Sequence, residues 1–207
     1  MIKIPIDNIE LEGDLAIPKG AVGLVIFAHG SGSSRQSPRN KFVAKEFNKD
    51  KLATLLIDLL TKQEDEDYEI RYNIELLTKR LLAITDWVKQ NNKINHLSIG
   101  YFGSSTGAAA TVFAADGRKD IVKTIVSRGG RVDLAYDTIH TLKIPILLIV
   151  GGEDYSILDA NRDVFDRIKS EKDLKIIPKA THLFKEPGAL EDVAKLASDW
   201  FRNNLKS

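Results

Sequence analysis

The residues best suited to chemistry lie in the pentapeptide Gly103–Gly107, which has the pattern G-x-S-x-G with Ser105 at its centre. An apolar run at 97–102 precedes it and an alanine-rich segment at 108–115 follows it, which predicts a strand, a sharp turn and a helix. In such a nucleophile elbow the residues two before and two after the serine must be small, because strand and helix approach closely there. Ser104 lacks glycines at both of these positions, so Ser105 is the candidate nucleophile.

An acid and a base follow two later apolar runs. Asp154 comes shortly after the run 144–150, and His182 comes shortly after the run 174–177. A serine hydroxyl is a weak nucleophile until a base removes its proton; histidine suits that task near neutral pH, and a carboxylate fixes the tautomer of the imidazole. The order Ser, Asp, His along the chain is that of α/β-hydrolase triads. Two further carboxylates in the same stretch are alternative acids, namely Glu153 and Asp159.

The tetrahedral intermediate of acyl transfer needs backbone N–H donors for its oxyanion. One donor is expected from Thr106, which directly follows the candidate nucleophile. The second is expected from the glycine-rich loop after the apolar run 22–28, with Ser31 as the first choice and Gly32 as the alternative. We interpret His29, in the same loop, as a structural residue that hydrogen-bonds the loop backbone.

Strands and helices alternate along the chain. Apolar runs typical of buried parallel strands are followed by segments whose apolar residues repeat at helical spacing. This alternation predicts a mostly parallel sheet with helices on both faces, in which sites form at the carboxyl ends of the strands. Residues 1–18 show strand-like alternation and predict an antiparallel N-terminal edge, where Pro5 is tolerated. The parallel strands are expected at 22–28, 53–57, 97–102, 121–126, 144–150 and 174–177, and the helices at 42–49, 74–89, 106–115, 159–168 and 190–205.

Length and composition limit the class of protein. The 207 residues, of which 43% are hydrophobic and 29% charged, suit a single domain over 1–207. A net charge of +1 gives no indication of binding to nucleic acid or to a membrane. The chain has no cysteine, which excludes disulfides, thiolate metal sites and a cysteine nucleophile. It also shows no signal-peptide core and no membrane-spanning apolar run, so a cytoplasmic protein is expected.

Five arginines fall in segments that could reach the carboxyl edge of the sheet: Arg35, Arg39, Arg71, Arg128 and Arg131. Arginine suits bidentate binding of a carboxylate or a phosphate. We therefore hypothesise that at least one of them selects an anionic group on the substrate, with Arg35 and Arg128 as the candidate substrate-binding residues. The alternative is that these arginines form ion pairs with nearby acidic residues at the surface.

These motifs resemble those of α/β-hydrolases of the dienelactone hydrolase-like group, in a compact form without a lid. The resemblance covers essentially the full length and rests on H-G-S-G-S-S-R at 29–35, the elbow at 103–107, G-G-E-D at 151–154 and A-T-H-L-F at 180–184. It implies the α/β-hydrolase fold and favours Asp154 over Glu153 as the acid. Dienelactone hydrolases proper use a cysteine nucleophile where this chain has Ser105. The resemblance therefore implies ester hydrolysis more strongly than it implies dienelactone as the substrate.

The expected protein is a serine carboxylesterase-like hydrolase. It would cleave a carboxylic ester or thioester of a small substrate through an acyl-enzyme, with Ser105, Asp154 and His182 as the triad and with no metal or organic cofactor. The alternatives are hydrolysis of another bond (lactone, peptide or carbon–carbon) on the same fold, or a catalytically silent binding module. The segment 128–143, where many relatives insert a lid, is short and predicts an open, shallow site. Homodimer formation through the C-terminal helix or an edge strand is left open.

Overall fold

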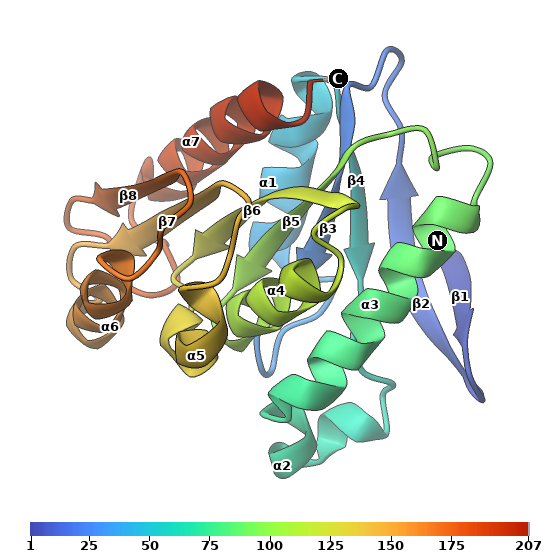
Figure 1. The fold of residues 1–207 in the computed structure, drawn as a ribbon, viewed down its shortest axis with the longest axis horizontal. Coiled ribbons are helices and arrows are strands. Elements are labelled where there is room, and N and C mark those ends of the chain that lie inside the picture. The colour runs from blue at the N-terminus through green and yellow to red at the C-terminus, as the bar shows by residue number, and fades with distance from the viewer. Residues whose placement is uncertain (207) are drawn as a thin grey trace.

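One mixed sheet forms the centre of the molecule. The computed structural model describes residues 1–206, and within them eight strands pair in the order β1-β2-β4-β3-β5-β6-β7-β8 (Figure 1). β3 to β8 pair in parallel, whereas β1 and β2 are antiparallel to their neighbours. This confirms the prediction of a mostly parallel sheet with an antiparallel N-terminal edge. The strands are β1 (Ile2–Ile6), β2 (Ile9–Ala16), β3 (Gly23–Ala28), β4 (Leu52–Ile57), β5 (Ile99–Ser104), β6 (Val122–Arg128), β7 (Ile146–Gly151) and β8 (Lys172–Ile177).

The central parallel strands are the continuous apolar runs of the sequence. β3, β4, β5 and β7 are buried at every residue. Such strands lie between two layers of helices, so both of their faces need apolar side chains. Because each crossover returns the chain to the same end of the sheet, the arrowheads of the parallel strands point toward one edge, at the lower left in Figure 1. The loops that leave these strands can therefore contribute to one site.

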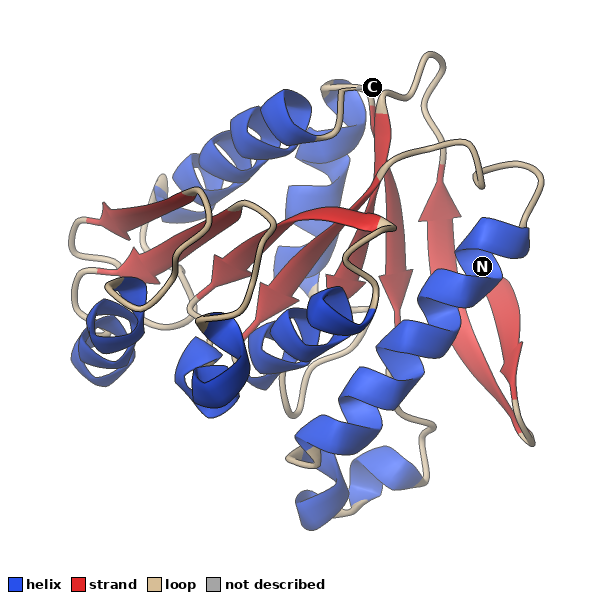
Figure 2. Ribbon diagram, viewed as in Figure 1, coloured by secondary structure: helices blue, strands red, loops and turns tan. Residues whose placement is uncertain are grey.

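Helices cover both faces of the sheet (Figure 2). α1 and α7 pack against each other over one apolar core, while α3 and α4 pack against each other over a second core on the opposite face. No helix within residues 1–206 combines the length and the apolar character needed to cross a membrane. The helices are α1 (Pro38–Lys49), α2 (Tyr68–Arg71), α3 (Ile74–Gln90), α4 (Thr106–Gly117), α5 (Tyr136–Ile139), α6 (Tyr155–Phe165) and α7 (Ala189–Asn204).

Two helices begin earlier than the apolar periodicity indicates. α1 starts at Pro38 rather than at 42, because the Ser37 side chain accepts the Asn40 N–H and a proline is tolerated in the first turn. α6 starts at Tyr155 rather than at 159, with Asp154 at its N-cap position. The first turn of α1 is polar, so its apolar periodicity begins only after that turn, whereas the first turn of α6 contains Ile157 and Leu158, which the predicted start left out.

Short helical segments also follow β4 and β6. A 3₁₀ turn at Glu64–Glu66 leads into α2, and a second one at Val132–Ala135 leads into α5. The sequence analysis did not predict either pair. The 3₁₀ turn at Val132–Ala135 and α5 lie in the connection from β6 to β7. The sequence analysis expected this connection to be short.

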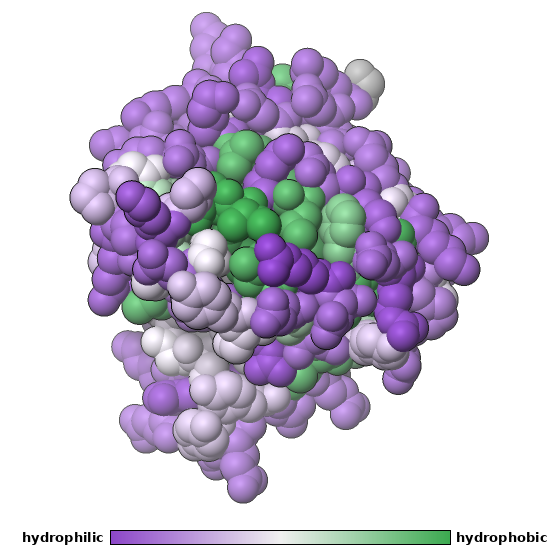
Figure 3. Space-filling model, turned by 90° about the vertical axis from the view of Figure 1, so that its left-hand side faces the viewer, coloured by the Kyte–Doolittle hydropathy of each residue, from purple (hydrophilic) through white to green (hydrophobic). Residues whose placement is uncertain are grey.

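β8 is the open edge of the sheet, opposite the N-terminal hairpin. On the side of the molecule that carries β8, apolar side chains form a patch bordered by polar ones (Figure 3). Ile176 of β8 is 40% exposed, while the same strand carries Lys172, Asp173 and Lys175. Charged side chains on an edge strand oppose pairing with another strand.

A glycine in β5 sets how closely α7 approaches the sheet. A Cβ atom at Gly100 would lie 2.7 Å from Cε1 of Phe201, whose side chain is fully buried in α7. Phe201 also packs edge-on against Phe47, with ring centroids 5.5 Å apart. The ring is therefore held on two sides and has little freedom to move away from an added methyl group.

We expect Gly100→Ala to lower the free energy of unfolding by about 1–3 kcal/mol, because the methyl group overpacks the contact with Phe201. Urea unfolding followed by circular dichroism measures this change. Gly117→Ala is the control: the atom nearest to a Cβ there belongs to the Leu82 side chain, 3.3 Å away, and alanine favours a helix. The control should be unchanged or more stable. A Gly100→Ala variant as stable as the wild type would contradict this account of α7 packing.

Candidate active site

Ser105 lies in a strained turn between β5 and α4. β5 ends at Ser104 and α4 begins at Thr106, so Ser105 occupies the N-cap position. Its φ of 49° and ψ of −126° form a backbone conformation that costs a non-glycine residue about 1–3 kcal/mol. Its side chain does not cap the helix. The turn instead leaves the first N–H groups of α4, and the positive end of the helix dipole, beside the serine.

Three glycines allow this turn. A Cβ atom at Gly103 would lie 2.6 Å from a backbone atom of α4, and one at Gly107 would lie 2.3 Å from the carbonyl oxygen of Ala28. Gly30 approaches from the loop after β3, where a Cβ atom would lie 2.7 Å from Cβ of Ser105. Backbone atoms cannot move aside as a flexible side chain can. The small residues expected on both sides of the serine are therefore required by close backbone contacts.

His182 and Asp154 form a hydrogen-bonded pair. His182 Nδ1 lies 2.7 Å from Asp154 Oδ2, and the two side chains are 39% and 10% exposed. An ionised carboxylate only accepts hydrogen bonds, so Nδ1 carries the proton and Nε2 of the neutral ring is an acceptor. Of the alternative acids, Asp159 pairs with Arg162 instead. An accessible ring held through Nδ1 has the orientation that a general base requires.

The segment 128–131 contacts both Ser105 and His182 and so lies between them. The N–H of Arg131 donates to the carbonyl oxygen of Ser105 at 3.0 Å. Gly129, with φ 51°, lies against the imidazole, because a Cβ atom there would be 3.4 Å from His182 Nδ1. No hydrogen bond joins Ser105 Oγ to His182 within residues 1–206. In enzymes such bonds often tighten only when the substrate is bound.

The loop after β3 is tied to the first residue of α4. The N–H of Ser31 donates to Oγ1 of Thr106 at 3.0 Å. An oxyanion that used the Ser31 N–H would therefore have to replace this bond. The N–H of Thr106 lies in the first turn of α4, where N–H groups have no partner within the helix. Gly32, the alternative to Ser31, has φ 66° and open space where a side chain would be.

His29 links the backbone of the same loop to the segment after β4 through two hydrogen bonds. Its Nε2 accepts the N–H of Leu59 at 3.0 Å, so Nδ1 carries the proton and donates to the carbonyl oxygen of Gly30 at 3.0 Å. Burial lowers the pKa of His29 below its ordinary value, and the bond to Gly30 only partly offsets this. The interpretation of His29 as a structural residue that hydrogen-bonds the backbone is confirmed.

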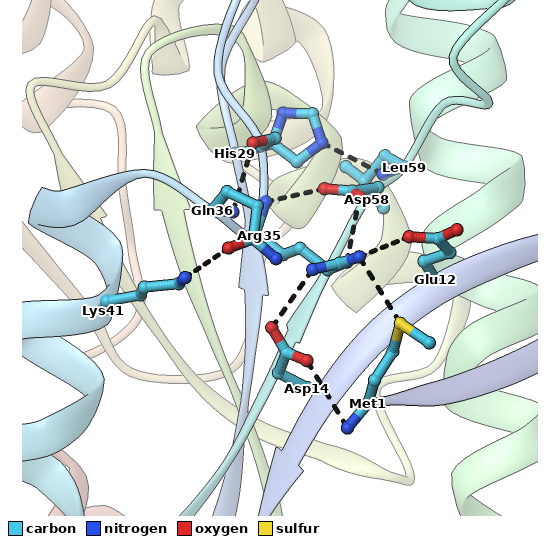
Figure 4. A network of polar contacts seen from close by, with 10 residues as sticks. Met1, Glu12, Asp14, His29, Arg35, Gln36, Lys41, Asp58 and Leu59 are labelled. Atoms are coloured by element: carbon cyan, nitrogen blue, oxygen red, sulfur yellow. Dashed lines mark hydrogen bonds and ion pairs between the residues drawn. The ribbon is translucent and has the colours of Figure 1, made fainter.

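Arg35 is held by three carboxylates, which Figure 4 shows converging on its guanidinium. It pairs with Glu12, with Asp14 at 3.4 Å and with Asp58 at 3.2 Å, and its side chain is 8% exposed. Burial opposes the charge, but the hydrogen bond to Glu12 and the nearby negative charges raise the pKa of Arg35 above its ordinary value. Its N–H also donates to Asp58 at 2.6 Å. Arg35 therefore anchors the loop to β2 and to the end of β4, as in the alternative of ion pairs with nearby acids, and substrate binding by Arg35 stays a prediction.

Arg128 is the other arginine expected to bind substrate, and its surroundings differ. It ends β6 with its Cα paired to that of Ser104, directly beside the elbow, and it is 7% exposed. Arg71 and Arg131 instead form ion pairs with Asp65 and Asp133, at 3.3 Å and 2.8 Å. For these two arginines, the alternative of ion pairs with nearby acids holds.

The sequence analysis missed two tyrosines that lie beside the loop after β3. Hydrogen bonding with the Ser31 side chain, and then with Tyr68, lowers the pKa of the Tyr72 hydroxyl. The rings of Tyr68 and Tyr72 are 4.8 Å apart and both are exposed. Their spacing of four residues, which puts two side chains on one helix face, is the signal that could have drawn attention to them.

The acidic run 64–67 is used within the fold. Glu64 pairs with Arg80 at 2.9 Å, and the Asp67 side chain caps α2 by accepting the N–H of Glu69. In the part of the chain that the structure describes, the histidine and acidic side chains form no group of three or more that could hold a metal ion.

Comparison with known proteins gives one family and a consistent set of structures. The dienelactone hydrolase family model matches residues 11–205. A dienelactone hydrolase from Anabaena variabilis is 49% identical and superposes with a TM-score of 0.96, over 99% of this chain and 97% of that one. Est1E of Butyrivibrio proteoclasticus, solved with ferulic acid, is 19% identical with a TM-score of 0.86 over 99% of each chain, which shows the fold alone.

A curated relative has a different name and a greater length. A Mycobacterium tuberculosis protein with the provisional name phosphoribosyl transferase is 45% identical over 204 residues, which are 99% of this chain and 46% of that protein. This chain thus spans about half the length of the curated relatives that it matches.

We expect the free energy of unfolding to rise more steeply with pH in the wild type than in His29→Gln. The pKa of His29 is lower in the folded chain than its ordinary 6.5, so the unfolded chain binds more protons below about pH 6.5. Stability is therefore fully present above this pH and is lost as the pH falls. Glutamine can still accept the Leu59 N–H but does not titrate. Urea titrations between about pH 5 and pH 7.5 measure both slopes, and equal slopes would contradict the prediction.

We expect Arg35→Met to lower the free energy of unfolding by about 3 kcal/mol, because it leaves three carboxylates around a site without a cation. The ratio of activities toward an anionic and a neutral ester should stay the same, since Arg35 anchors the loop rather than the substrate. Denaturant unfolding and steady-state kinetics test the two parts. A selective loss toward the anionic ester would restore Arg35 as a binding residue.

Proposed function

Because this chain belongs to the dienelactone hydrolase family, and is thus a hydrolase of the α/β type, we propose that it is a serine carboxylesterase-like enzyme. It cleaves a carboxylic ester or thioester of a small substrate through an acyl-enzyme. The observation that carries the proposal is the strained backbone of Ser105, at φ 49°, beside the His182–Asp154 pair. Strain of this kind persists where the surrounding structure imposes it, and it is concentrated at functional sites.

In the proposed mechanism Ser105 Oγ attacks the carbonyl carbon while His182 Nε2 takes its proton. Asp154 holds the Nδ1–H and stabilises the imidazolium. The N–H of Thr106 and that of Ser31 or Gly32 bind the oxyanion. His182 then gives the proton to the leaving alcohol or thiol, and afterwards activates a water molecule that releases the acid from Ser105.

The proposal does not extend the transferase name of the longer relatives to this chain. The match leaves more than half of the Mycobacterium tuberculosis protein uncovered, and we infer that its name refers to that uncovered part. The features of the matched half that bear on chemistry here are a serine elbow and a histidine–carboxylate pair, which suit acyl transfer to water. Lactone, peptide or carbon–carbon bond cleavage on the same fold, and a silent binding module, are the alternatives that substrate profiling separates.

We expect Ser105→Ala to lower kcat toward a p-nitrophenyl ester on the order of 10⁶-fold while the fold is retained. Asp154→Asn should lower kcat about 10⁴-fold, because asparagine no longer holds the imidazole in the tautomer that carries its proton on Nδ1. Ser104→Ala, at the buried neighbouring serine, is the matched control and should keep its activity within a few-fold. A fluorophosphonate probe should label the wild type and Ser104→Ala but not Ser105→Ala. Retained turnover or labelling in Ser105→Ala would overturn the proposal.

A further inference from the structure

Arg128, beside the elbow, and Arg39, in the first turn of α1, have no carboxylate partner in the part of the chain that the structure describes. Within residues 1–206 neither Arg128 nor Arg39 forms an ion pair, and Nε and Nη1 of Arg128 and Nε of Arg39 are buried without a hydrogen bond. Burial, and then the charge of Arg39, lower the pKa of Arg128 to about 10, so Arg128 is still charged at neutral pH. The charge of Arg39 thus acts on Arg128, and neither side chain forms an ion pair with a carboxylate within the described residues.

The surroundings of this pair add positive potential. Arg39 lies in the first turn of α1, where no acidic residue is present. The positive end of the dipole of a helix of this length favours an anion, although Pro38 has no N–H and Ser37 accepts the N–H of Asn40. On the other side, Cζ of Arg128 lies 6.0 Å from the ring of Phe184, which is two residues after His182. The loop that carries the candidate base therefore borders Arg128.

The position of Arg128 relates this cationic cluster to the candidate nucleophile. The Cα atoms of Arg128 and Ser104 are register partners in β6 and β5, and adjacent parallel strands are about 4.8 Å apart. Ser105 is the next residue, and Gly129 contacts the His182 ring. The backbone of Arg128 therefore lies directly beside the elbow that carries the candidate nucleophile.

A buried cation without a partner lowers stability, because it has lost its hydration and gained no compensating interaction. Arg35 shows the contrasting case, in which three carboxylates compensate the positive charge, so that none of it remains for a ligand to neutralise. The Arg128 site has the opposite balance: two positive charges, a helix N-terminus and buried donors that lack acceptors.

We propose that Arg128 and Arg39 bind a phosphate monoester group carried by the substrate, so that the enzyme hydrolyses acyl esters of small phosphorylated molecules. This inference rests on the proposed function, and it adds the substrate class. A phosphate monoester carries a charge of about −1.5 to −2 near neutral pH and three acceptor oxygens. It matches two guanidinium groups, whereas a carboxylate would compensate only one of them.

The first experiment measures binding without catalysis. In Ser105→Ala, inorganic phosphate at about ten times its dissociation constant should raise the melting temperature by about 3 °C over chloride at equal ionic strength. Acetate should raise it by less. Adding Arg128→Met to Ser105→Ala should abolish the shift, and adding Arg39→Met should reduce it by at least half. Adding Arg118→Met, at the far end of α4, should leave the shift unchanged.

Folding of the decisive variant is checked in the same measurement. Methionine is similar in length and apolar, so Arg128→Met in chloride should melt at the same temperature as its parent or higher, opposite to Arg35→Met. Absence of a phosphate shift in Ser105→Ala, a shift that persists with Arg128→Met, or a larger shift with acetate would each overturn the phosphate site.

The second experiment compares 1-acetylglycerol 3-phosphate with 1-acetylglycerol in the active enzyme. Arg128→Met should lower kcat/KM for the phosphorylated ester about 100-fold and leave that for the neutral ester within a few-fold. Equal losses for both esters would overturn the proposal. If the wild type hydrolyses neither ester, the proposed function is in question while the binding result stands. If it hydrolyses both equally, only the phosphate site fails.

Discussion

The close approach of backbone segments around Ser105 is the constraint on which the rest of this structure depends. Side chains at Gly30, Gly103 or Gly107 would each overlap the elbow or its neighbours, so the strained serine can form only where these three positions are glycine. The same device recurs at the end of β7, where a Cβ atom at Gly151 would lie 2.3 Å from the carbonyl oxygen of Ala180. The absence of a side chain there lets the loops that carry Asp154 and His182 approach each other, and the Glu153 N–H donates to the same carbonyl oxygen of Ala180 at 2.9 Å.

Electrostatics gives two arginines at the same sheet edge opposite roles. Arg35 is fixed by three carboxylates from β2 and the end of β4, and it stabilises the loop that packs against the elbow. Arg128 is equally buried but has a second arginine rather than a carboxylate for a neighbour. The first arrangement is complete within the protein, whereas the second is complete only with an anion. Residue type and position along the chain do not distinguish the two cases.

Membership of the dienelactone hydrolase family fixes the framework of the chain more firmly than its substrate. The match to the Anabaena variabilis dienelactone hydrolase extends over nearly the whole of both chains, yet position 105 is a serine and the sequence has no cysteine. Serine needs a stronger base than a thiol does, because a hydroxyl is a poor nucleophile at neutral pH. The short hydrogen bond between His182 and Asp154 supplies the orientation that such a base requires.

By itself the sequence determined the main strands and helices in their order along the chain and the mostly parallel sheet. It also determined the elbow at Ser105 and the acid and base candidates. These follow from local patterns, because apolar periodicity and glycine spacing are fixed along the chain. Tertiary structure alone decided that the Ser31 N–H is bonded to Thr106 and which arginine has a carboxylate partner. Glu12 and Asp14 meet Arg35 through the pairing of β2 with β4, whereas Arg128 at the end of β6 has no carboxylate partner within the described residues. Charge compensation depends on distances between segments that are remote along the chain, and a local pattern carries no information about them.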